Sequence, residues 1–261
     1  MRYPEIDVIN FRELGGIKTE DGRTIREGFL FRSGQPHDKI DEKSAARIEA
    51  LHLDTIFDMR DESTVANRPD YPFKGPKMVR VPVLELMRDS AKEKPIDFAA
   101  IDVSLIGDKR SCKELKKLYN DYLRIYQEIP FSKGFKQIFG ALSRHERILI
   151  HCQGGKDRTG LACIFILKAL GVDDKTVFAD YKYSNKVRKK KNHWRLKKVW
   201  KQSHQLHNVY YIRKLLMCTK KNYQTTMKAI YKEYPTFDAF LLGEFGIDQS
   251  TIQDWKNFYL N

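Results

Sequence analysis

The chain has 261 residues, of which 41% are hydrophobic and 31% charged, and its formal net charge is +14 at pH 7. This length and apolar content can bury a sizeable core in one domain, and an aromatic content of 12% excludes the composition of a disordered chain. No apolar run approaches the roughly 20 residues that a membrane helix needs, and the sequence as written has no signal-peptide pattern, so we expect a cytoplasmic protein; removal of a leader would make secretion the alternative.

The first half of the sequence alternates short apolar runs with helical patterns. We expect strands at residues 28–33, 55–60 and 78–83. A helix is predicted over 41–52, with Asp41 as its cap. The pattern weakens over 84–111, which indicates a long loop or short helices.

The second half contains one further strand and is otherwise helical. We expect helices at 112–129 and 132–144, a strand at 147–151, a helix at 159–170 and successive helices over 173–261. Strands that alternate with helices favour an α/β fold with a central, mostly parallel sheet covered on both faces, here with a helical C-terminal part. We treat residues 1–261 as a single domain.

Two compositional features bear on function. The four cysteines, Cys112, Cys152, Cys163 and Cys218, have no CxxC or zinc-ligand spacing, which predicts free thiols and no metal site. Residues 181–232 contain no Asp or Glu and 16 Lys and Arg, whereas the rest of the chain has a net charge of −2. This segment is either a solvated helical surface or the site of an anionic partner, namely a phosphorylated substrate, an acidic membrane surface or nucleic acid.

The strand at 147–151 leads directly into a polar loop that opens the next helix. The loop reads Cys152-Gln153-Gly154-Gly155-Lys156-Asp157-Arg158-Thr159-Gly160. Ligands of α/β sheets bind at the carboxyl ends of strands, next to helix N-termini. Five residues between Cys152 and Arg158 can curl into a cradle whose backbone N–H groups point at an anion, and the paired glycines allow close approach.

This loop predicts a nucleophilic cysteine. The helix N-terminus and Arg158 would both stabilise a Cys152 thiolate, which could then attack phosphorus. Arg158 can hold two phosphate oxygens, and Thr159 can donate a hydrogen bond to the departing sulfur. We therefore assign catalysis to Cys152 and Arg158, and substrate binding to Gln153, Gly154, Gly155, Lys156 and Thr159.

At these residues the chain resembles the cysteine-based protein tyrosine phosphatases, whose signature is a cysteine and an arginine separated by five residues. In its specific form the loop looks like that of the bacterial tyrosine and lipid phosphatases. The resemblance implies action on phosphotyrosine, phosphoserine or phosphothreonine proteins, or on phosphoinositides, without a cofactor. Five further blocks are similar to the family: 10–16, 30–33, 58–60, 178–181 and 245–248.

The general acid is not fixed by the sequence. Tyrosine phosphatases usually carry it in a Trp-Pro-Asp loop, which this chain lacks. Asp157 is the candidate that the resemblance favours, although it could instead orient Arg158 or a substrate hydroxyl. The alternatives are Asp58, Asp61, which could equally cap the following helix, and an acid within 84–108, where Glu85, Asp89, Asp97, Asp102 and Asp108 lie.

Several other residues allow two interpretations. Lys156 either adds positive charge beside the phosphate, as suits phosphoinositides, or faces solvent. Arg12, Arg32 and Arg60 are expected to pair with loop carboxylates rather than act in catalysis. Residues 186–217 lie where related enzymes carry a helical lid; within them Leu196, Val199 and Trp200 share one helix face, which either docks on the domain or meets anionic lipid.

Two functions compete with the phosphatase hypothesis. One is a catalytically idle module that binds anionic lipids or phosphoproteins, but such a module needs no nucleophile, and Cys152 and Arg158 are both present. The other is nucleic-acid binding through residues 181–232, where aromatic residues interleave with lysines. We consider nucleic acid an unlikely partner because it leaves the cysteine loop unexplained.

Overall fold

A five-stranded sheet organises the protein, with the strand order β1-β2-β5-β3-β4. The computed structural model describes residues 3, 5–88 and 111–261. The strands are β1 (Arg12–Glu13), β2 (Leu30–Ser33), β3 (Thr55–Asp58), β4 (Lys77–Arg80) and β5 (Ile148–His151). Only the β1–β2 pair is antiparallel within this sheet; the other neighbours are parallel. The prediction of a mostly parallel sheet in an α/β fold is confirmed.

Alternating side chains of the strands supply two separate cores, one on each face of the sheet. In β5, Ile148 and Ile150 belong to the larger core and Leu149 to the smaller one. In β3, Phe57 faces the larger core and Ile56 the smaller. This period of two explains why the central strands read as continuous apolar runs: both faces are buried.

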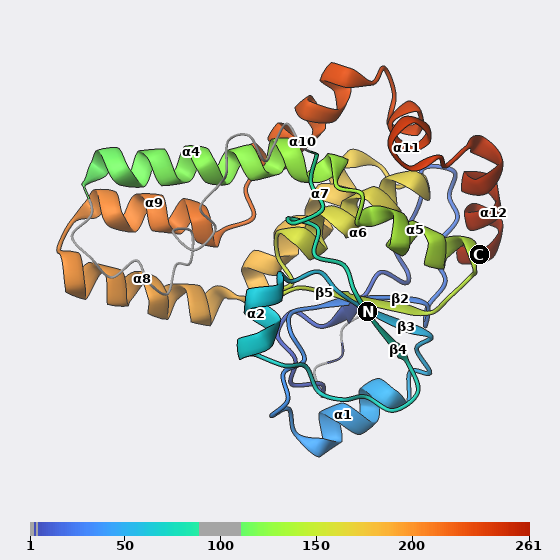
Figure 1. Cartoon of the computed structure of the whole chain (residues 1–261), viewed down its shortest axis with the longest axis horizontal. Coiled ribbons are helices and arrows are strands. Elements are labelled where there is room, and N and C mark those ends of the chain that lie inside the picture. The colour runs from blue at the N-terminus through green and yellow to red at the C-terminus, as the bar shows by residue number, and fades with distance from the viewer. Residues whose placement is uncertain (1–2, 4, 89–110) are drawn as a thin grey trace.

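Helices cover both faces, as Figure 1 shows. They are α1 (Glu42–Glu49), α2 (Glu62–Asn67), α4 (Cys112–Glu128), α5 (Phe135–Ser143), α6 (Arg158–Ala169), α7 (Asp174–Val187), α8 (Lys189–Ser203), α9 (Leu206–Leu216), α10 (Lys220–Glu233), α11 (Phe237–Phe245) and α12 (Gln249–Tyr259), with a 3₁₀ turn at Ile129–Phe131. Helix α1 begins at its predicted cap, since the Asp41 carboxylate accepts the Ser44 N–H.

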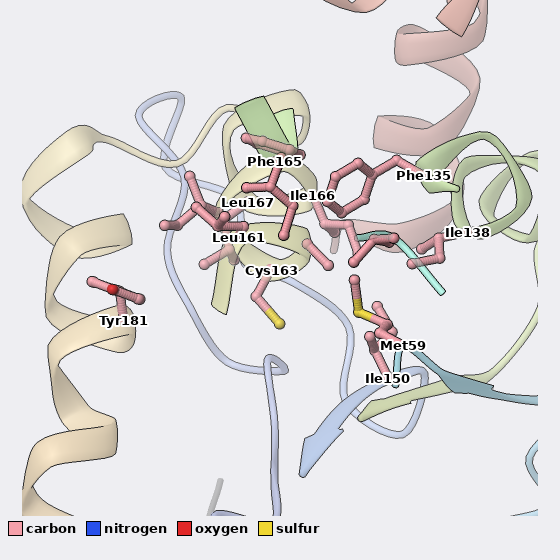
Figure 2. Close-up of a cluster of buried hydrophobic side chains, with 14 of the residues drawn as sticks. Met59, Phe135, Ile138, Ile150, Leu161, Cys163, Phe165, Ile166, Leu167 and Tyr181 are labelled. Atoms are coloured by element: carbon pink, nitrogen blue, oxygen red, sulfur yellow. The ribbon is translucent and has the colours of Figure 1, made fainter. Parts of the chain in front are cut away.

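Helix α6 is the central helix of the larger core and carries the catalytic loop of the sequence prediction at its N-terminus. Its side chains are buried almost all round, which explains why its pattern is apolar rather than amphipathic. Figure 2 shows Leu161, Cys163 and Ile166 of this helix packed near Met59 and Ile150 from the sheet side. The helix is therefore held rigidly against the strands.

Helices α4, α9 and α8 lie side by side and project from the sheet domain (Figure 1). We call these three helices the helical arm. The predicted helical character of the basic segment is confirmed, and Val199 is buried and Leu196 partly buried, as a docked face requires. Trp200, the third residue of the predicted face, is 42% exposed.

Most predicted elements are confirmed, with shorter ends. Strand β4 ends at Arg80, three residues before the predicted end, and Val81 and Val83 enter the core from a loop. Among the described residues, no helix is long and apolar enough to cross a membrane. That residues 1–261 form a single domain stays a prediction.

Candidate active site

Cys152 lies at the carboxyl edge of the sheet, directly after the central strand β5. The strand register places Ser33 of β2 and Asp58 of β3 level with His151, so three chain segments meet at this edge. Six residues further on, α6 begins at Arg158. Residues 152–159, which we call the cradle, thus join the end of a parallel strand to a helix N-terminus, the arrangement that the sequence predicted.

The cradle is curled by contacts that turn its carbonyl groups outward. Gly155 has φ +60°, and a Cβ atom there would lie 2.4 Å from the Ser33 carbonyl oxygen, so only glycine fits. The Gly155 carbonyl accepts hydrogen bonds from the Asn10 amide at 2.5 Å and the Arg32 guanidinium at 3.0 Å. Because these bonds hold the Gly155 carbonyl on Asn10 and Arg32, we expect the N–H groups of the loop to remain available for an anion.

A buried ion cluster supports the cradle from behind. Asp180 of α7 pairs with Arg12 at 2.9 Å and with Arg32 at 2.5 Å. Burial alone raises the pKa of Asp180, but the two guanidinium groups outweigh it and hold the pKa below its usual value. As expected, Arg12 and Arg32 pair with a carboxylate; it lies on a helix rather than on a loop. The sequence offered Asp180 only as part of a family block, and Asn10 likewise.

Replacement of Asp180 by asparagine is expected to destabilise the fold by about 3–5 kcal/mol, because it leaves two buried guanidinium groups without their counter-charge. Urea unfolding monitored by circular dichroism measures this change. Asp21→Asn is the matched control: Asp21 pairs with Arg23 on the surface, where its side chain is 52% exposed, so its loss should change the stability far less. Equal losses in the two variants would contradict a supporting role for Asp180.

The Cys152 thiol differs from the other buried thiols. Burial raises the pKa of Cys163 to about 11 and that of Cys218 to about 12. Cys152 is equally buried, and desolvation is again the largest influence, yet its pKa is lowered because the Arg158 charge and hydrogen bonds from Thr159 together outweigh burial. The Thr159 hydroxyl has no hydrogen-bond partner of ordinary geometry within the described chain, so it is available to the sulfur. Cys152 is thus the buried thiol poised to ionise.

We expect Cys152 to be alkylated by iodoacetamide at pH values below the ordinary thiol pKa of about 8.5. Its lowered pKa keeps the thiolate populated there, so the rate should fall only when the pH passes below that lowered value. Peptide mapping by mass spectrometry separates Cys152 from the exposed Cys112. In Arg158→Ala the inflection should move to higher pH; an unchanged inflection would show that Arg158 does not stabilise the thiolate.

Asp157 is held as an anion by three neighbours. Its carboxylate accepts hydrogen bonds from the hydroxyls of Tyr122, at 2.8 Å, and Tyr126, and lies 3.1 Å from the Lys156 ammonium. Burial raises its pKa, but Lys156 and the tyrosines outweigh burial and lower it. The sequence analysis missed both tyrosines. Their spacing of four residues on a predicted helix was the available signal.

Lys156 does not face solvent. Its side chain is buried, and its ammonium donates to the Tyr122 hydroxyl at 3.0 Å and to the Leu215 carbonyl at 2.7 Å. Leu215 lies near the C-terminus of α9, where unpaired carbonyls attract a cation. The interpretation of Lys156 as a solvent-facing lysine is therefore wrong, and its proposed positive charge beside a phosphate remains a prediction.

The structure separates the candidate acids. Asp61 lines the same pocket as Cys152 and Arg158, and its carboxylate pairs with Arg158 at 3.0 Å. It stands at the start of α2 without a capping hydrogen bond from its side chain, so the capping interpretation is wrong. Asp58 pairs with Arg60 instead of lining the pocket, and Glu85 accepts the Glu62 N–H. The candidates Asp89, Asp97, Asp102 and Asp108 lie outside the described residues.

One cluster near the cradle has the residue types of a metal site. Ligand atoms of Asp58, Asp70 and His151 lie within 4.8 Å of one another. Arg60 pairs with both carboxylates, at 2.7 and 2.8 Å, and so supplies the positive charge that a cation would bring. The imidazole of His151 is fully buried beside them, and although burial lowers its pKa, the two carboxylates raise it overall. This cluster fits a buried ion network better than a metal centre.

Cys152 and Arg158 open into the main pocket, of about 890 Å³. Its lining residues come from the loop before α1, from α2 and from the three helices of the helical arm. Apolar groups of Ile125, Ile129 and Leu161 line it together with Tyr122. Of the predicted substrate-binding residues, Gln153, Gly154 and Lys156 line this pocket. Gly155 and Thr159 are buried and are not part of its lining.

The mostly parallel sheet and the strand–cradle–helix unit are those of a protein tyrosine phosphatase-like fold. A model of the tyrosine phosphatase family matches residues 5–261, and the chain belongs to this family. It is 30% identical over 182 residues to a protein of Cupriavidus necator whose name assigns it provisionally to the tyrosine-protein phosphatases, with 68% of this chain and 61% of that protein covered.

A second relative is the triple specificity protein phosphatase PtpB of Mycobacterium tuberculosis, 28% identical over 188 residues, which cover 67% of this chain and 66% of PtpB. The chain thus matches 61% and 66% of the lengths of these two relatives. The family resemblance predicted from the cysteine loop is confirmed.

Proposed function

We propose that this protein is a cysteine-dependent phosphatase that hydrolyses phosphate monoesters through a phosphocysteine on Cys152. The observation that carries the proposal is the lowered pKa of the Cys152 thiol at the base of a pocket of about 890 Å³, beside Arg158 and a helix N-terminus. A thiolate among anion-binding groups suits attack on phosphorus.

In the first step, the Cys152 thiolate attacks phosphorus, a P–S bond forms, and the P–O bond to the leaving group breaks. The departing oxygen takes a proton from a carboxylic acid, for which we propose Asp157. In the second step, water attacks the phosphocysteine, the same carboxylate accepts a proton from that water, and the P–S bond breaks. Cradle N–H groups from Gln153 to Thr159 and the Arg158 guanidinium hold the equatorial oxygens in both steps.

We propose phosphotyrosine proteins as the first substrate class, with phosphoserine and phosphothreonine proteins and phosphoinositides as further classes. The apolar wall of Ile125, Ile129 and Leu161 suits an aromatic ring. The name of the mycobacterial relative gives that protein three specificities.

The test is phosphate release from a panel of phosphopeptides and soluble inositol phosphates. Release that ranks phosphotyrosine first supports the proposed order of substrates, and another ranking replaces it. If folded protein releases no phosphate from any of them, the protein is better described as a module that binds anionic lipids or phosphoproteins.

A second candidate role, contact with an anionic membrane surface, is favoured by exposed apolar residues of the helical arm. Trp194, Trp200 and Leu206 are 63%, 42% and 77% exposed, among lysines of a segment without acidic residues. Tryptophan beside lysine is typical of interfacial helices. Co-sedimentation with vesicles that contain phosphatidylserine, but not with neutral ones, and its loss in Trp194→Ala/Trp200→Ala, would support this role; no sedimentation with either would remove it.

A further inference from the structure

The wall of the main pocket carries more positive charge than the cradle accounts for. Besides Lys156 and Arg158, the basic residues that line it are Lys39, Arg68, Arg188, Lys191 and Arg195. The acidic lining residues are Asp38, Asp61 and Asp157, and the last two pair with Arg158 and Lys156. The described lining thus contains seven basic and three acidic residues.

Several of these cations crowd together across the pocket mouth. Lys191 belongs to α8, whereas Arg68 directly follows α2, so two separate helices bring them to the same pocket. Burial and then the charges of Arg188, Arg195 and Arg68 lower the pKa of Lys191, as expected for basic groups that line one pocket. Like charges held this close raise the free energy of the folded protein unless an anion sits between them.

Arg188 places this cluster next to the cradle. Its side chain is 6% exposed, and one terminal nitrogen donates to the Gly154 carbonyl at 3.1 Å. A Cβ atom on Gly154 would approach the same nitrogen to 2.8 Å, so the guanidinium lies directly over the glycine. Its Nε has no hydrogen-bond partner within the described chain. A buried, incompletely bonded guanidinium that lines a pocket is a site prepared for an anion.

We infer that Arg188, Lys191 and Arg68 form a second phosphate subsite at the pocket mouth, which binds a second phosphate group of the substrate held in the cradle. This inference rests on the proposed function for the first phosphate only. The substrate class is then a compound with two neighbouring phosphates. Such a compound is either a peptide with two nearby phosphorylated residues or an inositol bisphosphate, since both present two dianionic phosphate groups. A singly phosphorylated substrate leaves this subsite unused.

The test compares singly and doubly phosphorylated ligands in protein that cannot turn them over. In a Cys152→Ser background, calorimetry measures the affinity for a peptide with one or two phosphotyrosines and for inositol monophosphate and bisphosphate. We expect Lys191→Ala/Arg68→Ala to weaken binding of a doubly phosphorylated ligand by about tenfold or more and of its singly phosphorylated counterpart less than twofold. A selective loss in the peptide pair identifies a doubly phosphorylated peptide as the substrate, and a selective loss in the inositol pair identifies an inositol bisphosphate.

Lys190→Ala is the matched control, because Lys190 is the exposed neighbour on the same helix and does not line the pocket. Its binding should equal that of the parent protein, and Lys191→Arg should retain the selective affinity. Equal losses for singly and doubly phosphorylated ligands, no loss for either pair, or an equal loss in Lys190→Ala would each overturn the subsite.

Failure of the subsite and failure of the proposed function give different results. Turnover of singly phosphorylated peptide by the parent enzyme, without preference for the doubly phosphorylated one, would refute the subsite and leave the phosphatase intact. Selective binding without any turnover would refute the phosphatase and leave the subsite intact.

Discussion

Cys152→Ser is expected to reduce phosphate release by about 10³-fold or more while the protein stays folded. The Arg158 charge and the Thr159 hydrogen bonds stabilise the thiolate of Cys152. They cannot ionise a serine hydroxyl near neutral pH, so the variant lacks a nucleophile. The substitution replaces one atom at a buried position, so packing changes little. Initial rates on phosphotyrosine peptide, with thermal unfolding of both proteins, measure the two parts of this expectation.

Cys112→Ser provides the control, because Cys112 is an exposed thiol at the start of α4. That variant should keep its full rate. If Cys152→Ser retained more than about a tenth of the parental rate, the covalent mechanism would be refuted, and the pocket would have to act on phosphate by another route.

The sequence predicted the cradle well because its residues are contiguous. A strand, a cysteine, five loop residues, an arginine and a helix can all be read from one short segment, and their periodicities fix how they meet. The sheet was equally readable, since the runs at Leu30, Ile56 and Ile148 must be buried on both faces.

The groups around the cradle could not be predicted from the sequence. Asn10, Tyr122 and Asp180 reach it from separate parts of the chain, and no local pattern states that a tyrosine on a helix will meet a carboxylate 35 residues later. Lys156 shows the same limit. The sequence allowed Lys156 either beside the phosphate or in solvent, and no local pattern indicated that the carbonyl of Leu215 on a distant helix is its buried partner.

The basic segment, residues 181–232, is hydrogen-bonded to the cradle. Arg188, where α7 meets α8, donates to the Gly154 carbonyl, and Lys156 donates to the Leu215 carbonyl of α9. The basic segment was predicted to be a lid, a membrane contact or a solvated surface. In the structure it forms part of the pocket wall and is bonded to the loop beneath, so a change in the position of the arm would also move the cradle.

Among the acidic residues that the structure describes, Asp157 and Asp61 remain as candidates for the general acid. Asp157 has a lowered pKa in the substrate-free protein, which alone would oppose an acid role. A phosphate dianion in the cradle places negative charge beside this carboxylate and competes for Lys156, and both effects raise its pKa. Substrate binding would thus favour the protonated form of Asp157, which the leaving group needs as its proton donor. Asp61 already pairs with Arg158, which suits an orienting role.

A general acid and a residue that orients Arg158 differ in how the effect of their loss on turnover depends on the leaving group. A nitrophenolate departs readily without a proton, whereas a serine alkoxide does not. Asp157→Asn should therefore lower turnover of phosphoserine peptide by about 10²–10⁴-fold and of 4-nitrophenyl phosphate much less. Asp61→Asn should lower both by a similar factor, because it disturbs Arg158 and hence the binding of any phosphate. The reverse pattern would transfer the acid role to Asp61, and a uniform loss in both variants would place the acid elsewhere in the chain.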